Sequence, residues 1–234
     1  MRTKRAFLLC LVVTAGVTGL CADEGKGRTI CFAKGQWQAS EWTPVRLIEH
    51  ESTATLAQKA DSVGTGAFTK EERKKRLDNV LLMTDSKATE GEFTVTFRIG
   101  KEPGTAPGFF LCPVVKEGVL QKAISIFVAD YTMAIWLAEA DPASGKTQYT
   151  HLVRTATYQD PSVKHVFRCR YSKKRKSVAV RLDENDVLVL RFPDLEMNSL
   201  IGIWGCHGTC DFYDITIQEG GTLPWKGTPP EQKP

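Results

Sequence analysis

The sequence LIGIWGCHGTCDFYDITI, residues 200–217, decides the fold class. Two apolar stretches, residues 200–204 and 212–217, flank a short connector of glycine, histidine and threonine. Apolar stretches of this length beside a glycine-dependent link are typical of buried β-strands. Because a buried strand so near the C-terminus needs partners that are already in place, we expect the preceding chain to form a sheet.

The preceding chain alternates apolar and polar residues from about residue 92 onward. In GEFTVTFRIG, residues 91–100, Phe93, Val95, Phe97 and Ile99 fall on one side of an extended chain and polar side chains on the other. This period of two predicts a half-buried antiparallel strand. Similar stretches follow at residues 108–114, 122–129, 131–138, 149–158, 163–171, 176–182 and 186–192. Short strands at regular spacing predict an all-β sandwich of two antiparallel sheets or a barrel.

The hairpin signal is clearest at KSVAVRLDENDVLVLRF, residues 176–192, where Asp, Glu and Asn residues form the turn between two apolar stretches. In the last strand, Phe212 is out of parity with Ile215 and Ile217. This mismatch predicts either a β-bulge near Asp214 or a strand that is buried on both faces.

Helix-favouring composition is confined to residues 53–61 and 69–78. The second stretch has Thr69 followed three residues later by Glu72, and its basic residues come last. This order predicts one short, well-capped surface helix. A basic docking patch is the functional alternative for the same charges.

Residues 1–22 have the order of a secretory signal peptide: a basic end, a short apolar run and a small residue before a polar start. We expect cleavage after Ala22 and a secreted, periplasmic or cell-surface protein, and a lipid anchor on Cys21 is the alternative. Removing three of the 31 basic residues leaves 28 against 27 acidic ones. This balance does not favour nucleic-acid binding. No other apolar run is long enough to span a membrane.

Five cysteines follow the signal peptide: Cys31, Cys112, Cys169, Cys206 and Cys210. An oxidising compartment would permit a disulfide between Cys206 and Cys210, which are close in sequence. Cys112 and Cys169 lie in strand-like stretches, so we expect small buried apolar side chains there. The odd count leaves at least one thiol free or paired between chains. No cysteine and histidine spacing indicates a zinc site.

The order of these stretches resembles the concanavalin A-like lectin/glucanase jelly roll and, more narrowly, the bacterial secreted domain named 3-keto-disaccharide hydrolase. The likeness covers about residues 92–218. It rests on an aromatic strand that ends near an arginine, residues 93–99, and on the hairpin at residues 177–190. It also rests on the closing motif residues Gly202, His207, Gly208, Phe212, Asp214, Ile215 and Ile217.

The resemblance implies a two-sheet antiparallel jelly-roll sandwich, here with one short surface helix. Residues 23–91 would add N-terminal strands and that helix to the sandwich, residues 92–218 would form its core, and residues 219–234 would be a tail rich in Pro and Gly. The function it implies is carbohydrate recognition. One alternative is a glycoside hydrolase that acts on a 3-keto-disaccharide or related glycoside, and another is a non-catalytic cell-surface interaction module.

Aromatic and polar side chains on the open face of one sheet would contact sugar rings. Trp136 is opposite in parity to its apolar neighbours on the same stretch, so we expect it to face away from the core. His151 and His165 alternate with apolar residues, and a buried, hydrogen-bonded histidine is the alternative for both. The candidate carbohydrate-binding residues, expected to share one concave face, are Arg98, Trp136, His151, Arg154 and Tyr158.

Candidates for catalysis are weaker. Glu139 and Asp141 are the nearest match to the paired carboxylates of glycosidases, but Pro142 ends the strand and no third acid follows. His207 lies in the glycine-flanked connector and is the third candidate. A structural calcium ion would need loop oxygens such as those near Asp141 or Asp211, and neither position has the spacing of a calcium-binding loop. No other cofactor is evident.

Overall fold

The closing stretch of the sequence contributes one strand to each of two sheets. The computed structural model describes residues 27–38, 40, 42–50, 57–64, 80–85, 90–101, 105–129, 131–192, 194, 196, 198, 200–206 and 210–219, with the backbone alone for residues 80–85 and 206. Strand β14 (Leu200–Cys206) lies inside a seven-stranded sheet, and β15 (Asp211–Glu219) lies inside an eight-stranded sheet. The two apolar stretches are therefore buried because each has strand neighbours on both sides.

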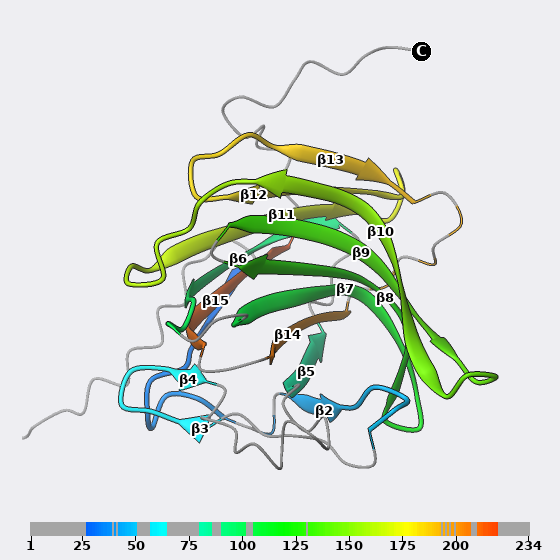
Figure 1. Cartoon of the computed structure of the whole chain (residues 1–234). Helices are drawn as coiled ribbons and strands as arrows, with labels where there is room; N and C mark the ends of the chain where they lie inside the picture. The colour runs from blue at the N-terminus through cyan, green and yellow to red at the C-terminus, as the bar shows by residue number, and fades with distance from the viewer. Residues whose placement is uncertain are drawn as a thin grey trace, which may run out of the picture.

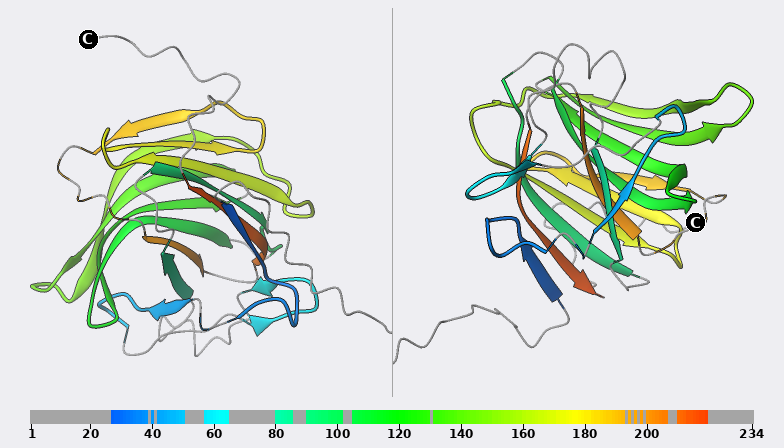
Figure 2. Two further views of the ribbon diagram at one scale, coloured as in Figure 1. Left: turned by 180° about the vertical axis from the view of Figure 1, so that it is seen from behind. Right: turned by 90° about the horizontal axis from the view of Figure 1, so that it is seen from below.

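All pairings between the strands are antiparallel, and the two sheets form a jelly-roll sandwich whose layers are visible in Figures 1 and 2. The eight-stranded sheet has the order β13 (Leu188–Arg191), β12 (Ser177–Leu182), β11 (His165–Ser172), β6 (Glu90–Arg98), β15, β4 (Val63–Gly64) and β3 (Ala57–Gln58), with β1 (Gly27–Cys31) also paired to β15. The seven-stranded sheet has the order β10 (Lys146–Ala156), β9 (Thr132–Asp141), β8 (Val119–Ala129), β7 (Ala106–Lys116), β14, β5 (Val80–Asp85) and β2 (Thr43–Val45).

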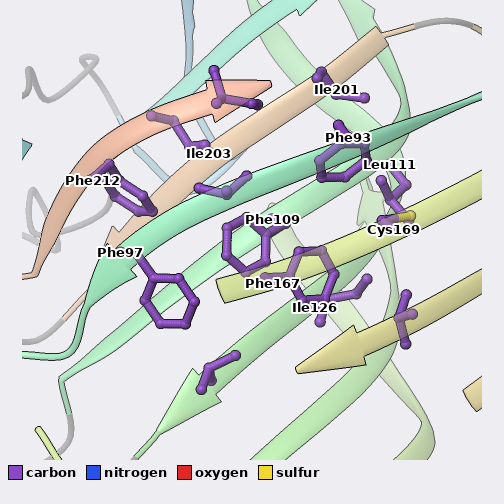
Figure 3. Packing of buried hydrophobic residues seen from close by; sticks show 14 of the residues in the cluster. Phe93, Phe97, Phe109, Leu111, Ile126, Phe167, Cys169, Ile201, Ile203 and Phe212 are labelled. Carbon is purple, nitrogen blue, oxygen red and sulfur yellow. The ribbon is translucent and has the colours of Figure 1, made fainter. Parts of the chain in front are cut away.

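The core between the sheets is rich in phenylalanine (Figure 3). The rings of Phe109 on β7 and Phe167 on β11 stack with centroids 4.1 Å apart and an interplanar angle of 6°. Phe97 and Phe212 contact Phe109 edge-on. Because Phe109 belongs to the seven-stranded sheet and the other three to the eight-stranded sheet, these contacts join the two layers.

The alternation seen in the sequence gives the expected faces. On β6, Phe93, Val95 and Phe97 are buried in the core, and the residues between them lie on the outer side. The predicted hairpin is present as β12 and β13. The register between β15 and β6 shifts between Phe212 and Asp214. This shift confirms the predicted bulge, which lets Phe212 reach the core although its parity differs from that of the later isoleucines.

The helix-favouring stretches give a different result. Ala57–Gln58 pairs with Val63–Gly64 as two very short strands, so the helical preference of residues 53–61 is wrong where the chain is described. Gln58 Nε2 donates to the carbonyl oxygens of Phe32 and Ser62, and these tertiary bonds outweigh a weak local propensity. The helix predicted at residues 69–78 lies outside the described residues. None of the described residues forms an α-helix.

The signal peptide predicted at residues 1–22 lies outside the described part of the chain, as does the tail predicted at residues 219–234 except for Glu219, which ends β15. Within that part, no helix is long and apolar enough to cross a membrane. Cys112 and Cys169 are buried as predicted, and burial raises the pKa of the Cys112 thiol to about 11. The side chain of Cys206 is not among those described, so its bridge to Cys210 stays a prediction.

Candidate functional site

Trp136 lies on the outer face of the seven-stranded sheet, the face turned away from the core. On β9, Met133 and Ile135 point into the core, and Trp136 points to the opposite side. This placement follows from the alternation of the strand, and it confirms the predicted parity. Trp136 is only partly buried, so part of its ring is open to a ligand.

Trp136 is one member of a continuous aromatic series that crosses five neighbouring strands. Its ring stacks on Phe127 of β8, with centroids 6.1 Å apart and an interplanar angle of 18°, and meets His151 of β10 edge-on at 4.7 Å. Phe127 in turn contacts Trp204 of β14 at 6.5 Å, and Trp204 contacts Phe110 of β7 at 5.7 Å. We call these five residues, Phe110, Phe127, Trp136, His151 and Trp204, the aromatic face.

A glycine makes room for the aromatic face. Trp204 is paired with Gly108 of β7, and a Cβ atom at Gly108 would lie only 2.2 Å from the indole ring of Trp204. It would also lie 2.6 Å from the carbonyl oxygen of Ile126. The indole therefore lies directly against bare backbone, a position that only glycine permits.

The polar rim of the aromatic face comes from β10. His151 is paired with Trp136, and Arg154, after a register shift, is paired with Ala134 of β9. Both His151 and Arg154 are exposed. Sequence reasoning placed these two residues with Trp136 correctly, and the alternative of a buried His151 is wrong.

Buried polar atoms also lie within the aromatic face. The Nε1 atoms of Trp136 and Trp204 and the hydroxyl oxygen of Ser125, which is paired with Trp136, are buried. None of the three has a hydrogen-bond partner among the described contacts. An unsatisfied buried polar group costs about 1–3 kcal/mol.

The end of β2 and the segment after it pack against one end of the aromatic face. Val45 and Leu47 pack in a cluster with Phe110. The backbone of Arg46 is hydrogen-bonded to Gly118 and Leu120, which fixes this segment beside the start of β8. The opposite region of the face, around His151 and Arg154, has the exposed side chains.

Tyr158 lies at the end of the same sheet. It is 61% exposed and contacts Tyr131, which is 66% exposed, with ring centroids 5.5 Å apart. The pair stands where the β8–β9 turn meets the end of β10, since the backbone N–H of Thr157 donates to the carbonyl oxygen of Tyr131. Tyr158 is thus an exposed aromatic residue outside the aromatic face. Among the described ring contacts, it has none with the five residues of that face.

Arg98 does not share this face, and the expectation that it would is wrong. It ends β6 in the eight-stranded sheet and is paired with Asp211 of β15. Its guanidinium donates to the Asp211 carboxylate at 2.7 Å, and this hydrogen bond raises the pKa of Arg98. The alternation correctly placed Arg98 outside the core, but β6 belongs to the other sheet.

The carboxylate candidates point away from Trp136. Glu139 and Asp141 have the opposite parity to Trp136 on β9, so they lie on the other side of the strand. Glu139 forms an ion pair with Lys122 at 2.7 Å. Asp141 accepts hydrogen bonds in the following turn from Ser144 and Ala143, which lower its pKa. His207 lies outside the described residues.

Metal binding has no support from the positions considered in the sequence. The Asp141 carboxylate is used in its turn, and Asp211 is held by Lys59 and Arg98. In the part of the chain that the structure describes, no three or more His, Cys, Asp or Glu side chains form a group that could hold a metal ion.

Comparison with known proteins finds similarity of fold. No protein-family model and no curated protein sequence matches the chain. A structure described as a native glycosidic hydrolase aligns with a TM-score of 0.61 and 10% identity, covering 84% of this chain and 97% of the other. The carbohydrate-binding module CBM66 from Bacillus subtilis aligns with a TM-score of 0.54 and 11% identity, over 76% and 96% of the two chains.

A third similar structure is the exoplasmic/lumenal domain of VIP36 in its form bound to Ca2+ and Man3GlcNAc. It has a TM-score of 0.54 and 13% identity, and the alignment covers 86% of this chain and 90% of that one. At such low identity these likenesses establish the fold alone, and they confirm the predicted jelly-roll sandwich.

Phe110, Phe127 and Trp204 are the residues of the aromatic face that sequence reasoning missed. The signal was present in all three cases. Phe110 lies between core residues Phe109 and Leu111. Phe127 lies between core residues Ile126 and Val128, and Trp204 follows core residue Ile203. The parity argument that placed Trp136 outside the core would have placed these three rings there as well.

Proposed function

We propose that this chain is a secreted carbohydrate-recognising domain that binds sugar on its aromatic face, with Trp136 as the platform. The observation that carries the proposal is the continuous series of aromatic contacts across five strands, in which the partly exposed Trp136 lies beside the exposed His151. Binding surfaces for small ligands typically combine aromatic walls with a few polar groups that fix orientation.

The chemistry of a sugar ring suits this surface. A pyranose has an apolar face of C–H groups, which packs on an aromatic ring, and hydroxyl groups at its edge, which need hydrogen-bond partners. Trp136 would supply the ring, and His151 and Arg154 would supply polar contacts at the rim. The CBM66 module and the Man3GlcNAc-bound domain of VIP36 support the proposal, because proteins with a similar fold are described as carbohydrate-binding.

The proposal is recognition without cleavage. The resemblance to 3-keto-disaccharide hydrolases and the similarity to a glycosidic hydrolase make cleavage the alternative. Cleavage of a glycoside needs two carboxyl groups on either side of the scissile bond. Glu139 and Asp141 lie on the other side of β9 and are engaged with Lys122 and the turn, so neither supports cleavage on the aromatic face.

A glycan array followed by calorimetry on the best ligand tests the proposal. We expect Trp136→Ala to weaken binding by about 5- to 150-fold, by analogy with a nucleobase stacked on an aromatic side chain, whose loss costs about 1–3 kcal/mol. Trp136→Phe should keep most of the affinity. Val189→Ala is the matched control, because Val189 is 56% exposed on β13 of the other sheet. Unchanged affinity in Trp136→Ala would exclude Trp136 as the platform.

Two further measurements separate the alternatives. Incubation with the bound glycan and with a 3-keto-disaccharide should release no product, and turnover that Glu139→Gln abolishes would show an enzyme. Binding in EDTA should equal binding in calcium, because the carboxylates of Asp141 and Asp211 already have protein partners. Loss of binding in EDTA would show that calcium is required.

A further inference from the structure

A cavity lies at one end of the eight-stranded sheet, whereas the aromatic face belongs to the seven-stranded sheet. Its volume is about 480 Å³. The polar side chains that line it come from separate loops and strand ends: Lys59 after β3, Arg98 and Lys101 at the end of β6, Ser162 before β11, and Asp211 at the start of β15. We call it the Arg98 cavity.

The cations of the Arg98 cavity are held in place by a buried carboxylate. The side chain of Asp211 is only 6% exposed. One of its oxygens accepts from Lys59 and the other from Arg98, the second at 2.7 Å. Gly64 gives this group its room, because a Cβ atom there would lie 2.7 Å from the Asp211 carboxylate. The single negative charge of Asp211 therefore faces two cations and leaves one positive charge unbalanced within this group.

Positive charge is in excess in the lining. Lys59, Arg98 and Lys101 stand against the single carboxylate of Asp211. The Arg98 guanidinium uses one of its nitrogens on Asp211, and Lys101 makes no ion pair within the described chain, so both have donors left for a ligand. Two other carboxylates lie outside the lining. The charge of Asp61 acts on Arg98, and Asp160 interacts with the charge of Lys101 while it accepts the backbone N–H and the hydroxyl of Ser162.

We propose that the Arg98 cavity binds a monosaccharide-sized ligand that carries a carboxylate or sulfate group. A volume of about 480 Å³ lies within the range of small-molecule sites. Arginine and lysine recognise such oxyanions through charge-assisted hydrogen bonds, and the fixed guanidinium of Arg98 needs no reordering on binding. This site does not depend on the sugar-binding role of the aromatic face, because the two surfaces share no residue.

Calorimetry with glucuronate, glucose 6-sulfate and glucose tests this assignment. We expect both anionic sugars to bind, with an affinity that falls as the salt concentration rises. Glucose should not bind at this site. Lys101→Gln should weaken glucuronate binding at least tenfold, and this variant removes no ion pair found among the described residues. Arg98→Gln should weaken it further. Lys174→Gln, which removes an exposed lysine from the turn between β11 and β12, is the control and should bind glucuronate like the wild type.

Three results would overturn the assignment: no binding of either anionic sugar, equal binding of glucose, or glucuronate binding that survives both Lys101→Gln and Arg98→Gln. Chemical-shift mapping with glucuronate shows which surface binds the sugar, so failure of the Arg98 cavity can be told apart from failure of the proposed function of the aromatic face. Shifts at Gly100 and Ser162 support the cavity, and shifts confined to Trp136 and His151 contradict it.

Discussion

The aromatic face and the Arg98 cavity are both binding surfaces in this fold, but they are built in different ways. The aromatic face uses side chains in the middle of neighbouring strands, where antiparallel register sets their spacing. The Arg98 cavity uses strand ends and loops that are brought together from distant parts of the chain. The first is held by ring contacts and the second by ion pairs, so changes in packing should affect the first and changes in charge the second.

The largest effect is expected at Gly108, beneath the aromatic face. Gly108→Ala would force Trp204 and the backbone near Ile126 apart, because its Cβ would lie 2.2 Å and 2.6 Å from them. Overpacking usually lowers the free energy of unfolding by about 1–3 kcal/mol, and we expect about 3 kcal/mol for Gly108→Ala. Urea denaturation measures the loss, and the tryptophan emission should shift in the folded state.

Gly145→Ala is the control for Gly108→Ala. Gly145 has a positive φ of 64° in the β9–β10 turn, and a Cβ there would meet nothing within 4 Å. Its backbone strain alone should cost about 1 kcal/mol. Equal losses in the two variants would show that the contact with Trp204 is unimportant. Glucuronate binding that disappears in Gly108→Ala while the protein stays folded would show that the two surfaces are coupled.

The next effect is expected at Asp211, in the Arg98 cavity. Asp211→Asn removes the charge that holds Lys59 and Arg98. A charge-assisted hydrogen bond contributes about 1.5–3 kcal/mol to stability. Both cations are partly exposed, so solvent screening lowers the contribution of each bond here. We expect a net loss of about 1–2 kcal/mol. The loss should shrink in high salt, and sugar binding on the aromatic face should be unchanged.

Asp214→Asn is the matched control on the same strand. Asp214 accepts one hydrogen bond from the hydroxyl of Thr96, and the amide oxygen of asparagine can accept it equally well. The change in stability should stay within about 0.5 kcal/mol. If both variants lose the same stability, then the ion pairs of Asp211 contribute nothing specific.

The same contrast explains what the sequence could predict. Period-two alternation identified β6, β9 and the outward direction of Trp136, because side-chain direction is a local property of an extended chain. Arg98 points outward on β6 by the same rule, but alternation does not say which sheet a strand joins. Sheet order depends on contacts between distant strands, so Arg98 was grouped with the wrong face.

The Arg98 cavity could not be predicted from local pattern. Lys59 and Lys101 are 42 positions apart in the sequence, and neither is marked by a motif. Both lysines line the same cavity as Asp211 because the loops that follow β3 and β6 and the loop that precedes β11 lie at the same end of one sheet. The bulge at Tyr213 was predictable, by contrast, because the parity of Phe212 conflicts with that of Ile215 within a single strand.

The third effect, the smallest, concerns the pH dependence of stability near the Arg98 cavity. His165 is 4% exposed, and its two ring nitrogens lie 2.8 Å from the Asp183 carboxylate and 2.8 Å from the carbonyl oxygen of Asp160. Both partners are acceptors, so both contacts are hydrogen bonds only when the imidazole is protonated. The bond with Asp183 raises the pKa of His165 although burial opposes it.

Asp183 titrates in the other direction. Burial acts to raise its pKa, but the hydrogen bonds from His165 and from the backbone N–H of Val166 lower it overall. A lowered pKa gives stability that is present above the unfolded value of about 3.9 and is lost as the pH falls below it. A raised histidine pKa gives stability that is present below about 6.5 and is lost as the pH rises through the folded pKa.

Both contributions of the His165–Asp183 pair are therefore present between about pH 4 and 6.5, and stability should fall as the pH rises from about 6.5 through the raised pKa of His165. Thermal melts of the wild type and of His165→Phe measure this. The two melting temperatures should approach each other as the pH rises, by about 2–4 °C for each kcal/mol lost. His151→Phe, on the exposed rim of the aromatic face, should keep the wild-type pH dependence. If His151→Phe flattens the profile and His165→Phe does not, the pH-sensitive group belongs to the aromatic face, and the division between an apolar and a charged surface is wrong.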